Sequence, residues 1–290
     1  MSNKKHHVWF ITLIGRPNAG KSTFVNTLIG EKVSIVSKTP QTTQRPVRGI
    51  YTDEQMQVIF LDVPGFHQSV RDWNQQLNDV VLRSLEESDG ILRLIDASRS
   101  AGKEEQLIDE LLEKVNKPVI TVYSKIDTVD GRGTVHCAST IPPDAMVLSS
   151  ETEEGIPEIL TAIKDVLPQW ELLYDEDHYT DQDIFTRVSE IVREKIFRAY
   201  RDEIPHSVYV EVYNYEDNEW LVRIEAVVHC ESDSQKKIII WSGAENLKKI
   251  GTQARKELEK LFEKKVYLGL RVKVSKGWRR DKQVTKDLLG

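Results

Sequence analysis

The chain has 290 residues, of which 39% are hydrophobic and 30% are charged, so it can bury a core and is not a disordered segment. No apolar stretch approaches the ~20 residues that span a bilayer, and two cysteines cannot build a disulfide framework or a cysteine zinc site. The net charge is −6, yet residues 235–290 hold 16 Lys and Arg against 6 Asp and Glu. This asymmetry predicts two domains, the second with an anionic partner, unless the cations only solvate a C-terminal helix.

The first part of the chain alternates apolar strands with amphipathic helices. We expect strands at 8–14, 56–61, 91–95, 119–123 and 146–148, and helices at 22–28, 104–115 and 157–166. Strands that alternate with helices favour a mostly parallel sheet with helices on both faces. The sequence therefore predicts a doubly wound α/β domain over residues 1–172.

The second part of the chain has a different pattern. Residues 173–183 are polar and acidic and predict a linker. After it we expect a helix at 183–200, strands at 208–213 and 220–230, a strand-like piece at 236–241, a helix at 244–263 and a strand at 267–274. This order predicts a smaller α+β domain over residues 184–290.

A phosphate-binding loop follows the first strand. Gly15-Arg-Pro-Asn-Ala-Gly-Lys21-Ser22 fits the pattern G-x-x-x-x-G-K-[ST] and stands between a predicted strand and a predicted helix. Its glycines let backbone N–H groups wrap a phosphate at a helix N-terminus. Lys21 would reach the β- and γ-phosphates, and Ser22 would offer its hydroxyl to Mg²⁺.

A second motif, Asp62-Val-Pro-Gly65, ends the strand at 56–61. Asp62 at the edge of the sheet can hold Mg²⁺ through water, and Gly65 lets its N–H approach a γ-phosphate. D-x-x-G is a weak signal alone and a strong one about forty residues after a phosphate loop. In the polar stretch between them, Thr43 can close onto Mg²⁺ when a γ-phosphate is present, although an ordinary exposed loop is the alternative.

A third motif selects the base. Ser124-Lys-Ile-Asp127 places a carboxylate just past a buried strand, where it can accept both N–H groups on the Watson–Crick edge of guanine. Adenine cannot satisfy that carboxylate, which disfavours an ATP-using P-loop kinase. Ser149 and Ser150 would supply backbone near the guanine carbonyl.

Together these motifs resemble those of the translation-factor-related GTPases, and in particular the Era family. The resemblance extends beyond the GTPase motifs, to residues 193–195, 203–208, 235–237, 250–255 and 273–278. It implies a type II KH-like RNA-binding fold over residues 184–290 and a Mg²⁺-dependent switch protein that binds GTP and GDP. It further implies a partner in the 3′ end of small-subunit (16S) ribosomal RNA and in the ribosomal subunit precursor. We expect a cytoplasmic monomer, and the basic end also admits peripheral contact with the anionic inner membrane.

The resemblance also assigns roles to individual residues. The catalytic residues would be Lys21, Thr43 and Gly65, and the Mg²⁺ ligands would be Ser22, Thr43 and Asp62. The nucleotide-binding residues would be Gly15, Asn18, Ala19, Gly20, Lys21, Ser22, Thr23, Ser124, Lys125, Asp127, Ser149 and Ser150. Asn18 stands where related GTPases coordinate potassium, so stimulation by K⁺ is a further hypothesis.

Two features of the GTPase motifs bear on nucleotide affinity and on catalysis. Ser124 replaces the usual asparagine, and one lost hydrogen bond of this type weakens binding by roughly 0.5–1.5 kcal/mol. Phe66 follows the D-x-x-G motif, where Ras-like enzymes have a glutamine that orients the attacking water. Since a phenyl ring cannot position water, the resemblance implies slow intrinsic hydrolysis, helped by a monovalent cation or a partner.

A further departure from the family pattern lies in the second domain. KH domains clamp a nucleic-acid backbone with a G-x-x-G loop, and the matching residues here, 241–244, contain a single glycine. The predicted RNA-binding residues are Trp241, Ser242, Gly243, Lys248, Lys249, Arg255, Lys276 and Arg279. The alternative to RNA binding is a degenerate Era-like scaffold that holds nucleotide weakly and uses its second domain to bind protein.

Overall fold

The computed structural model describes residues 6–37, 39, 41–66, 72–128, 141–166, 169–200, 203–240 and 245–289. The chain forms two compact units. The first comprises residues 1–34, 43–181 and 288–290, and the second comprises residues 35–42 and 182–287. No helix in the described ranges is long and apolar enough to cross a membrane.

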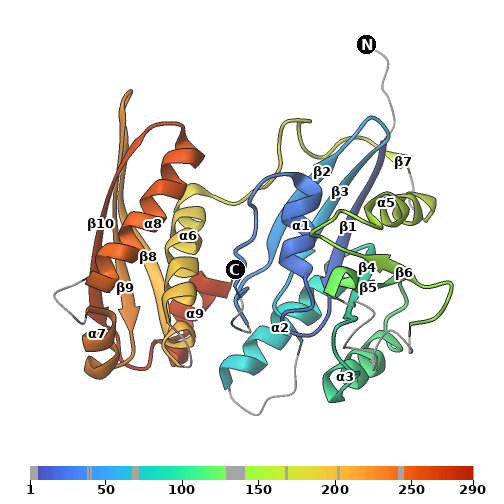
Figure 1. Cartoon of the computed structure of the whole chain (residues 1–290), viewed down its shortest axis with the longest axis horizontal. Coiled ribbons are helices and arrows are strands. Elements are labelled where there is room, and N and C mark those ends of the chain that lie inside the picture. Colours follow the sequence, from blue (N-terminus) through green and yellow to red (C-terminus); the bar gives the residue numbers. More distant parts are fainter. Residues whose placement is uncertain are drawn as a thin grey trace. The chain divides into compact units, whose positions relative to one another are not determined.

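The first unit is built on a seven-stranded sheet (Figure 1). Six strands follow the order β2-β3-β1-β4-β5-β6, and β7 pairs with β1. All neighbours pair in parallel except β2 with β3 and β7 with β1. The strands are β1 (His6–Ile14), β2 (Val47–Thr52), β3 (Met56–Asp62), β4 (Gly90–Asp96), β5 (Val119–Ser124), β6 (Met146–Leu148) and β7 (Gln169–Trp170).

Helices cover both faces of this sheet. The helices are α1 (Lys21–Ile29), α2 (Asp72–Glu87), α3 (Lys103–Leu112) and α5 (Ile156–Asp165). On one face, Phe24 of α1 and Ile159 of α5 share a buried cluster with β1, β3 and β4. On the other, Leu85 of α2 and Ile108 of α3 pack against β3. The predicted doubly wound α/β fold is confirmed, although the sequence did not predict β2, α2 and β7.

The carboxyl ends of the parallel strands meet at one edge of the sheet. In the strand register Leu13 lies opposite Asp62, Asp96 opposite Ser124, and Ser124 opposite Leu148. The motif residues that follow or end these strands are therefore neighbours, as ligand-binding residues are in open α/β sheets.

Residues 173–181 are attached to the first unit. The buried Gln57 side chain of β3 accepts a hydrogen bond from the Tyr174 N–H (3.0 Å) and donates one to the Tyr174 carbonyl (2.9 Å). Further along, the Ile50 N–H donates to the Tyr179 carbonyl at 2.9 Å. Most of the segment predicted as a linker is therefore held on the sheet, and the boundary between the units follows Asp181.

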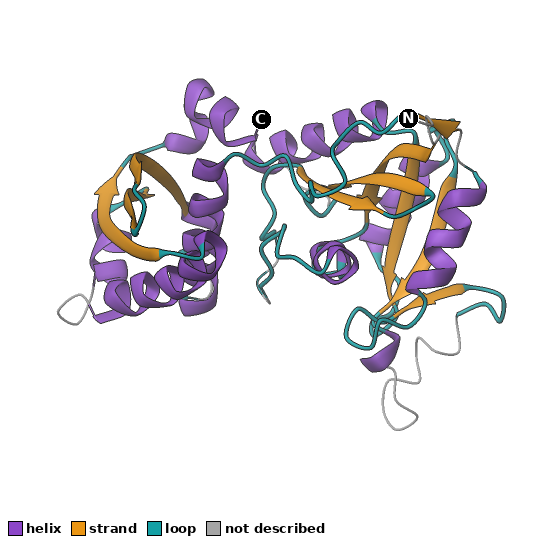
Figure 2. Cartoon of the chain, turned by 90° about the horizontal axis from the view of Figure 1, so that it is seen from above, coloured by secondary structure: helices purple, strands orange, loops and turns teal. Residues whose placement is uncertain are grey.

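The second unit has a three-stranded sheet of order β10-β9-β8, with helices packed against it (Figure 2). β9 pairs with β10 in parallel and with β8 antiparallel. Its elements are α6 (Ile184–Ala199), β8 (Val208–Asp217), β9 (Leu221–Cys230), α7 (Asp233–Ile240), α8 (Glu245–Phe262) and β10 (Lys265–Val274). A last helix, α9 (Lys282–Leu289), follows. In the core, Val192 of α6 and Ala254 of α8 pack against Ile224 of β9.

The prediction of a strand at 236–241 is wrong, because the described part of this segment lies in the helix α7. A capping box starts the helix: the Gln235 N–H donates to the Ser232 hydroxyl (3.3 Å), and the Gln235 side chain accepts from the Ser232 N–H (3.2 Å). The sequence Ser232-Asp-Ser-Gln235 indicates the start of a helix, and this signal outweighs the three consecutive isoleucines that favour a strand. The order of the domain is thus α-β-β-α-α-β.

Candidate functional site

The phosphate loop joins β1 to the N-terminus of α1. Asn18 and Gly20 adopt left-handed backbone conformations, with φ of 64° and 96°. At Gly15 a Cβ atom would lie 2.5 Å from the Leu94 carbonyl oxygen, so only glycine fits beside β4. The loop therefore turns tightly and presents its N–H groups together with the positive end of α1, the arrangement that binds phosphate. Thr23 stands in the first turn of α1.

Lys21 is buried inside this loop. Its ammonium donates to the carbonyls of Gly15 (3.1 Å) and Arg16 (3.3 Å). Burial lowers the pKa of Lys21 to about 8, with the Asp62 carboxylate opposing the shift. An anion bound in the loop would raise this pKa again, because it would stabilise the charged form.

Asp62 is the buried carboxylate of the site. It is fully buried, and among the described residues neither oxygen has a hydrogen-bond partner. Burial raises its pKa, and the positive charge of the Lys21 ammonium opposes the shift. An unpartnered buried carboxylate is unfavourable unless a cation neutralises it.

Hydroxyls complete the oxygen donors near Asp62. The Ser22 Oγ lies 3.2 Å from the Thr43 Oγ1, which brings two predicted Mg²⁺ ligands together. Among the described residues, no three His, Cys, Asp or Glu side chains are grouped so that they could hold a metal ion by themselves. One carboxylate with two hydroxyls fits Mg²⁺, which takes few protein ligands and completes its shell with water and phosphate oxygens.

Gly65 and Phe66 follow Asp62. A Cβ atom at Gly65 would lie 2.6 Å from the backbone nitrogen of Pro17, so this segment touches the phosphate loop closely. Phe66 is half-buried against the apolar cluster that contains Leu61. Its side chain therefore belongs to the core and cannot orient a water molecule.

The predicted base-binding residues lie together at the ends of β5 and β6. The Ser149 hydroxyl donates to Asp127 Oδ1 at 2.7 Å and accepts from the Thr152 N–H at 3.1 Å. Ser149 is buried, so it fixes the orientation of the carboxylate. The Ser150 carbonyl accepts a hydrogen bond from Thr27 of α1 at 3.1 Å.

Ser124 keeps a tie to the phosphate loop. Its hydroxyl lies 2.7 Å from the carbonyl oxygen of Ala19 and 3.1 Å from that of Ile95. A serine hydroxyl has one proton, so the shorter contact to Ala19 is the main hydrogen bond. The link between this loop and the phosphate loop is thus made by a residue shorter than asparagine.

Two ion pairs in the site escaped the sequence reasoning. Lys125 has a left-handed backbone, and its ammonium lies 2.9 Å from Asp96 at the end of β4. Burial opposes ionisation of Asp96, but hydrogen bonds from Lys125 and Ser98 outweigh it and lower its pKa. In the phosphate loop, Arg16 pairs with Glu105 of α3 at 3.3 Å. Both pairs join residues distant in sequence, so local spacing carries no signal for them.

The predicted RNA-binding residues fall into three groups. Trp241, Ser242 and Gly243 lie outside the described residues. Exposed cations are Lys248, Lys249 and Arg255 on α8, and Lys276 after β10. Arg279 is engaged within its own unit: it pairs with Glu231 at 3.7 Å, donates to the His206 carbonyl and covers the Trp278 ring at 5.5 Å.

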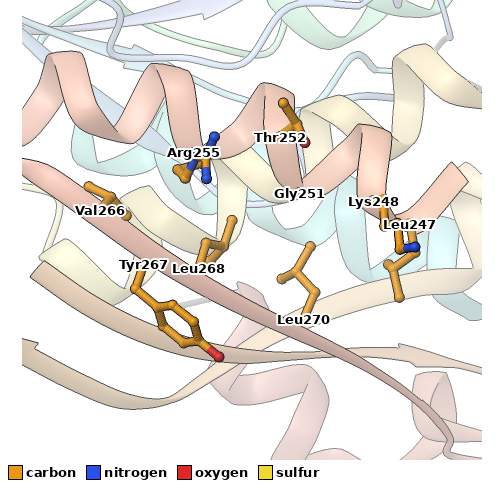
Figure 3. A pocket seen from close by; sticks show the side chains of 9 residues that line it. All are labelled: Leu247, Lys248, Gly251, Thr252, Arg255, Val266, Tyr267, Leu268 and Leu270. Carbon is orange, nitrogen blue, oxygen red and sulfur yellow. The ribbon is translucent and has the colours of Figure 1, made fainter. Parts of the chain in front are cut away.

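A pocket of about 590 Å³ lies between α8 and β10 (Figure 3). Lys248, Thr252 and Arg255 line it from α8, and Leu268 and Leu270 line it from β10. At Gly251 a Cβ atom would meet only the Leu270 side chain, at 3.5 Å, so the helix is open there. A glycine in the middle of a helix was the sequence signal for this groove.

Comparison with known proteins covers both units. A family model described as a 50S ribosome-binding GTPase matches residues 10–125, and a KH domain model matches residues 203–279. GTPase Era of Treponema denticola is 40% identical over 96% of this chain and 98% of its own length. GTPase Era of Lacticaseibacillus paracasei is 38% identical over 98% of this chain and 97% of its own length.

Two solved structures resemble the whole chain. One is Era in complex with MgGDPNP and nucleotides 1506–1542 of 16S ribosomal RNA, with a TM-score of 0.91, 32% identity and coverage of 98% of this chain and 99% of that one. The other is a single-residue variant of Aquifex aeolicus Era bound to GDP and aluminium fluoride, with a TM-score of 0.89, 32% identity and the same coverage. With the motifs at one sheet edge and a KH domain after them, the chain belongs to the Era family of GTPases.

Proposed function

We propose that this chain binds GTP and GDP, hydrolyses GTP slowly with Mg²⁺, and binds the 3′ end of 16S ribosomal RNA to assist assembly of the small ribosomal subunit. The observation that carries the nucleotide part is the convergence of Lys21, Asp62 and Asp127 on one edge of the sheet. The RNA part rests on the whole-chain likeness to Era bound to 16S ribosomal RNA and on the groove between α8 and β10.

Guanine selection is assigned to Asp127. Its carboxylate, oriented by Ser149, would accept two N–H groups from guanine and meet no second donor on adenine. Ser124 supports the site indirectly, through its hydrogen bond to the Ala19 carbonyl. The scaffold alternative rested on Ser124 and on the incomplete G-x-x-G pattern at residues 241–244. The hydrogen bond of Ser124 to Ala19 weakens the first of these supports.

Mg²⁺ would be held by Asp62, Ser22 and Thr43. When bound, the ion neutralises charge on the β- and γ-phosphate oxygens. The chain itself would contribute the Lys21 ammonium, the N–H groups of the phosphate loop and the N–H of Gly65 to stabilise charge on the transferring phosphoryl group. Because Phe66 packs into the core, no side chain at that position orients water, and intrinsic hydrolysis is slow. Stimulation by K⁺ at Asn18 remains a hypothesis, and equal rates in potassium and sodium buffers would count against it.

RNA would enter the groove between α8 and β10. Lys248 and Arg255 on its rim can contact phosphates, while Leu268 and Leu270 form an apolar floor against which bases can pack. Gly251 lets the RNA backbone approach the helix. Lys249 and Lys276 add cations nearby, and contacts from residues 241–243 remain a prediction. Ribosomal RNA as the partner supports a cytoplasmic location, and peripheral contact with the inner membrane rests on the basic end of the chain alone.

Binding of a labelled RNA with the sequence of nucleotides 1506–1542 of 16S ribosomal RNA tests the RNA part. We expect the Lys248→Gln/Arg255→Gln variant to bind it at least about tenfold more weakly, since each lost phosphate contact removes part of the electrostatic affinity. Lys260→Gln is the matched control, because Lys260 is exposed on the same helix outside the groove. Equal loss in both variants, or no binding by the unaltered chain, would contradict the proposal.

A further inference from the structure

The side chain of Ser34 is a buried polar group that the nucleotide motifs do not include. The residue is 1% exposed, and its Oγ has no hydrogen-bond partner among the described residues. Its backbone is fixed by the Asn26 side chain of α1, which accepts from the Ser34 N–H (2.8 Å) and donates to the Ser34 carbonyl (2.7 Å). A buried hydroxyl without a partner is unfavourable, and in folded proteins it commonly marks the place of a bound water or ion.

The packing of the preceding residue places Ser34 near the carboxyl end of β3. Val33 shares a buried cluster with Phe60 of β3. A Cβ atom at Gly49, which lies opposite Phe60 on β2, would contact the Val33 side chain at 3.8 Å. Side chains alternate along a strand, so Asp62 faces the same side of the sheet as Phe60. Ser34, the residue after Val33, therefore lies on the side of the sheet toward which the Asp62 carboxylate points.

The Ser34 hydroxyl lies beside that carboxylate. Burial raises the pKa of Asp62 and the Lys21 charge opposes the rise; the nearby hydroxyls of Ser22 and Ser34 also lower this pKa. Within the described part of the chain, neither Asp62 oxygen nor the Ser34 Oγ completes a hydrogen bond, so three neighbouring buried oxygens remain unsatisfied. A hydrated cation satisfies such oxygens, because its charge neutralises the carboxylate and its water molecules donate protons.

We propose that Ser34 is a positioning residue of the magnesium site, where its hydroxyl holds the Asp62 carboxylate and a water molecule of the ion in place. This inference rests on the proposed function, in which Asp62, Ser22 and Thr43 hold Mg²⁺, and it adds a residue that does not touch the ion itself. A serine hydroxyl donates one proton and accepts up to two, so Ser34 can serve the carboxylate and a water molecule together. Removing a group that orients a metal ligand commonly lowers metal affinity by about 10- to 100-fold.

The test compares Ser34→Ala with the unaltered chain, each loaded with fluorescent GDP. The rate of GDP release is measured while Mg²⁺ is titrated, because an ion bound jointly by protein and phosphates holds the nucleotide. We expect the Mg²⁺ concentration at the midpoint to rise about tenfold in Ser34→Ala, with release in EDTA unchanged. Ser88→Ala is the matched control and should leave the midpoint unaltered, because the Ser88 hydroxyl is also buried and donates to the Leu85 carbonyl at 3.3 Å, before the start of β4.

Thermal unfolding without Mg²⁺ and nucleotide separates this role from packing. If the Ser34 hydroxyl served only the fold, its removal would lower the midpoint of thermal unfolding. Because the replaced group is buried and unsatisfied, we expect Ser34→Ala to be at least as stable as the unaltered chain. A loss of stability under these conditions, an unchanged Mg²⁺ midpoint, or an equal rise of that midpoint in Ser88→Ala would overturn the inference. Failure of the proposed function would appear differently, as absence of GDP binding by the unaltered chain at any Mg²⁺ concentration, and it would overturn this inference as well.

Discussion

Replacing Ser124 with alanine removes the link between β5 and the phosphate loop. The Ser124 hydroxyl lies 2.7 Å from the Ala19 carbonyl oxygen, and both residues are buried, at 2% and 0% exposure. Alanine is smaller by one oxygen atom and introduces no clash. The substitution therefore tests one hydrogen bond.

The size of the effect follows from the burial of that bond. Removing the donor from a buried acceptor costs about 1–3 kcal/mol, more than the net value of an exposed hydrogen bond. If this loss falls on the loop that must wrap the phosphates, affinity for GDP decreases by roughly 5- to 150-fold. The affinity should fall equally for GTP and GDP, because both nucleotides use the phosphate loop that the Ser124 hydrogen bond supports.

The assay is titration with fluorescent GDP and GTP in the presence of Mg²⁺. Ser84→Ala is the matched control, since the Ser84 hydroxyl is also buried and donates to the Val80 carbonyl within α2, at 2.9 Å. It should leave nucleotide affinity unchanged. Unaltered affinity in Ser124→Ala, or an equal loss in Ser84→Ala, would refute the view that Ser124 supports the phosphate loop.

Three further predictions concern other parts of the chain. In Gly65→Ala the new Cβ would lie under 3 Å from the backbone of the phosphate loop. Single-turnover hydrolysis of GTP should therefore slow about tenfold or more. An unchanged rate would contradict the proposed role of the Gly65 N–H at the γ-phosphate. Lys117→Met removes hydrogen bonds to three carbonyls at the end of α2. Calorimetry should show a midpoint of thermal unfolding that is lower by about 2–8 °C. Replacing the exposed Lys114 with Met is the control and should leave the midpoint unchanged. Burial lowers the pKa of His229 although Glu211 opposes the shift, so its contribution to stability is complete above pH ~6.5 and is lost as the pH falls through its folded pKa. Thermal unfolding between pH 5 and 8 should therefore depend less on pH in His229→Gln, and an equal dependence would contradict this assignment.

The nucleotide motifs were predictable because their chemistry is local. In the phosphate loop, glycine positions, Lys21 and Ser22 must follow one another along a single turn, so spacing alone identifies them. Asp62 and Asp127 each end a buried strand, and parallel strands bring such ends to one edge. Fold class and candidate site thus followed from the same pattern.

What escaped prediction depends on contacts between distant residues. In α2 the exposed Leu82 directly follows the buried Val81, so only the core that receives Leu85 reveals which face of the helix is buried. The pairing of Asp96 with Lys125 and the attachment of residues 173–181 to Gln57 require the folded sheet. At 233–240 a local signal existed, since the capping box at Ser232 competes with an apolar run that resembles a strand.

A titration of the purified chain with fluorescent GTP, GDP and ATP, in potassium buffer with Mg²⁺, tests the central claim most directly. If Asp127 selects guanine in a site assembled around Lys21 and Asp62, GTP and GDP bind saturably and ATP does not compete. Absence of guanine-nucleotide binding at near-millimolar concentration, or equal binding of ATP, would contradict the assignment of this chain as a guanine-nucleotide switch.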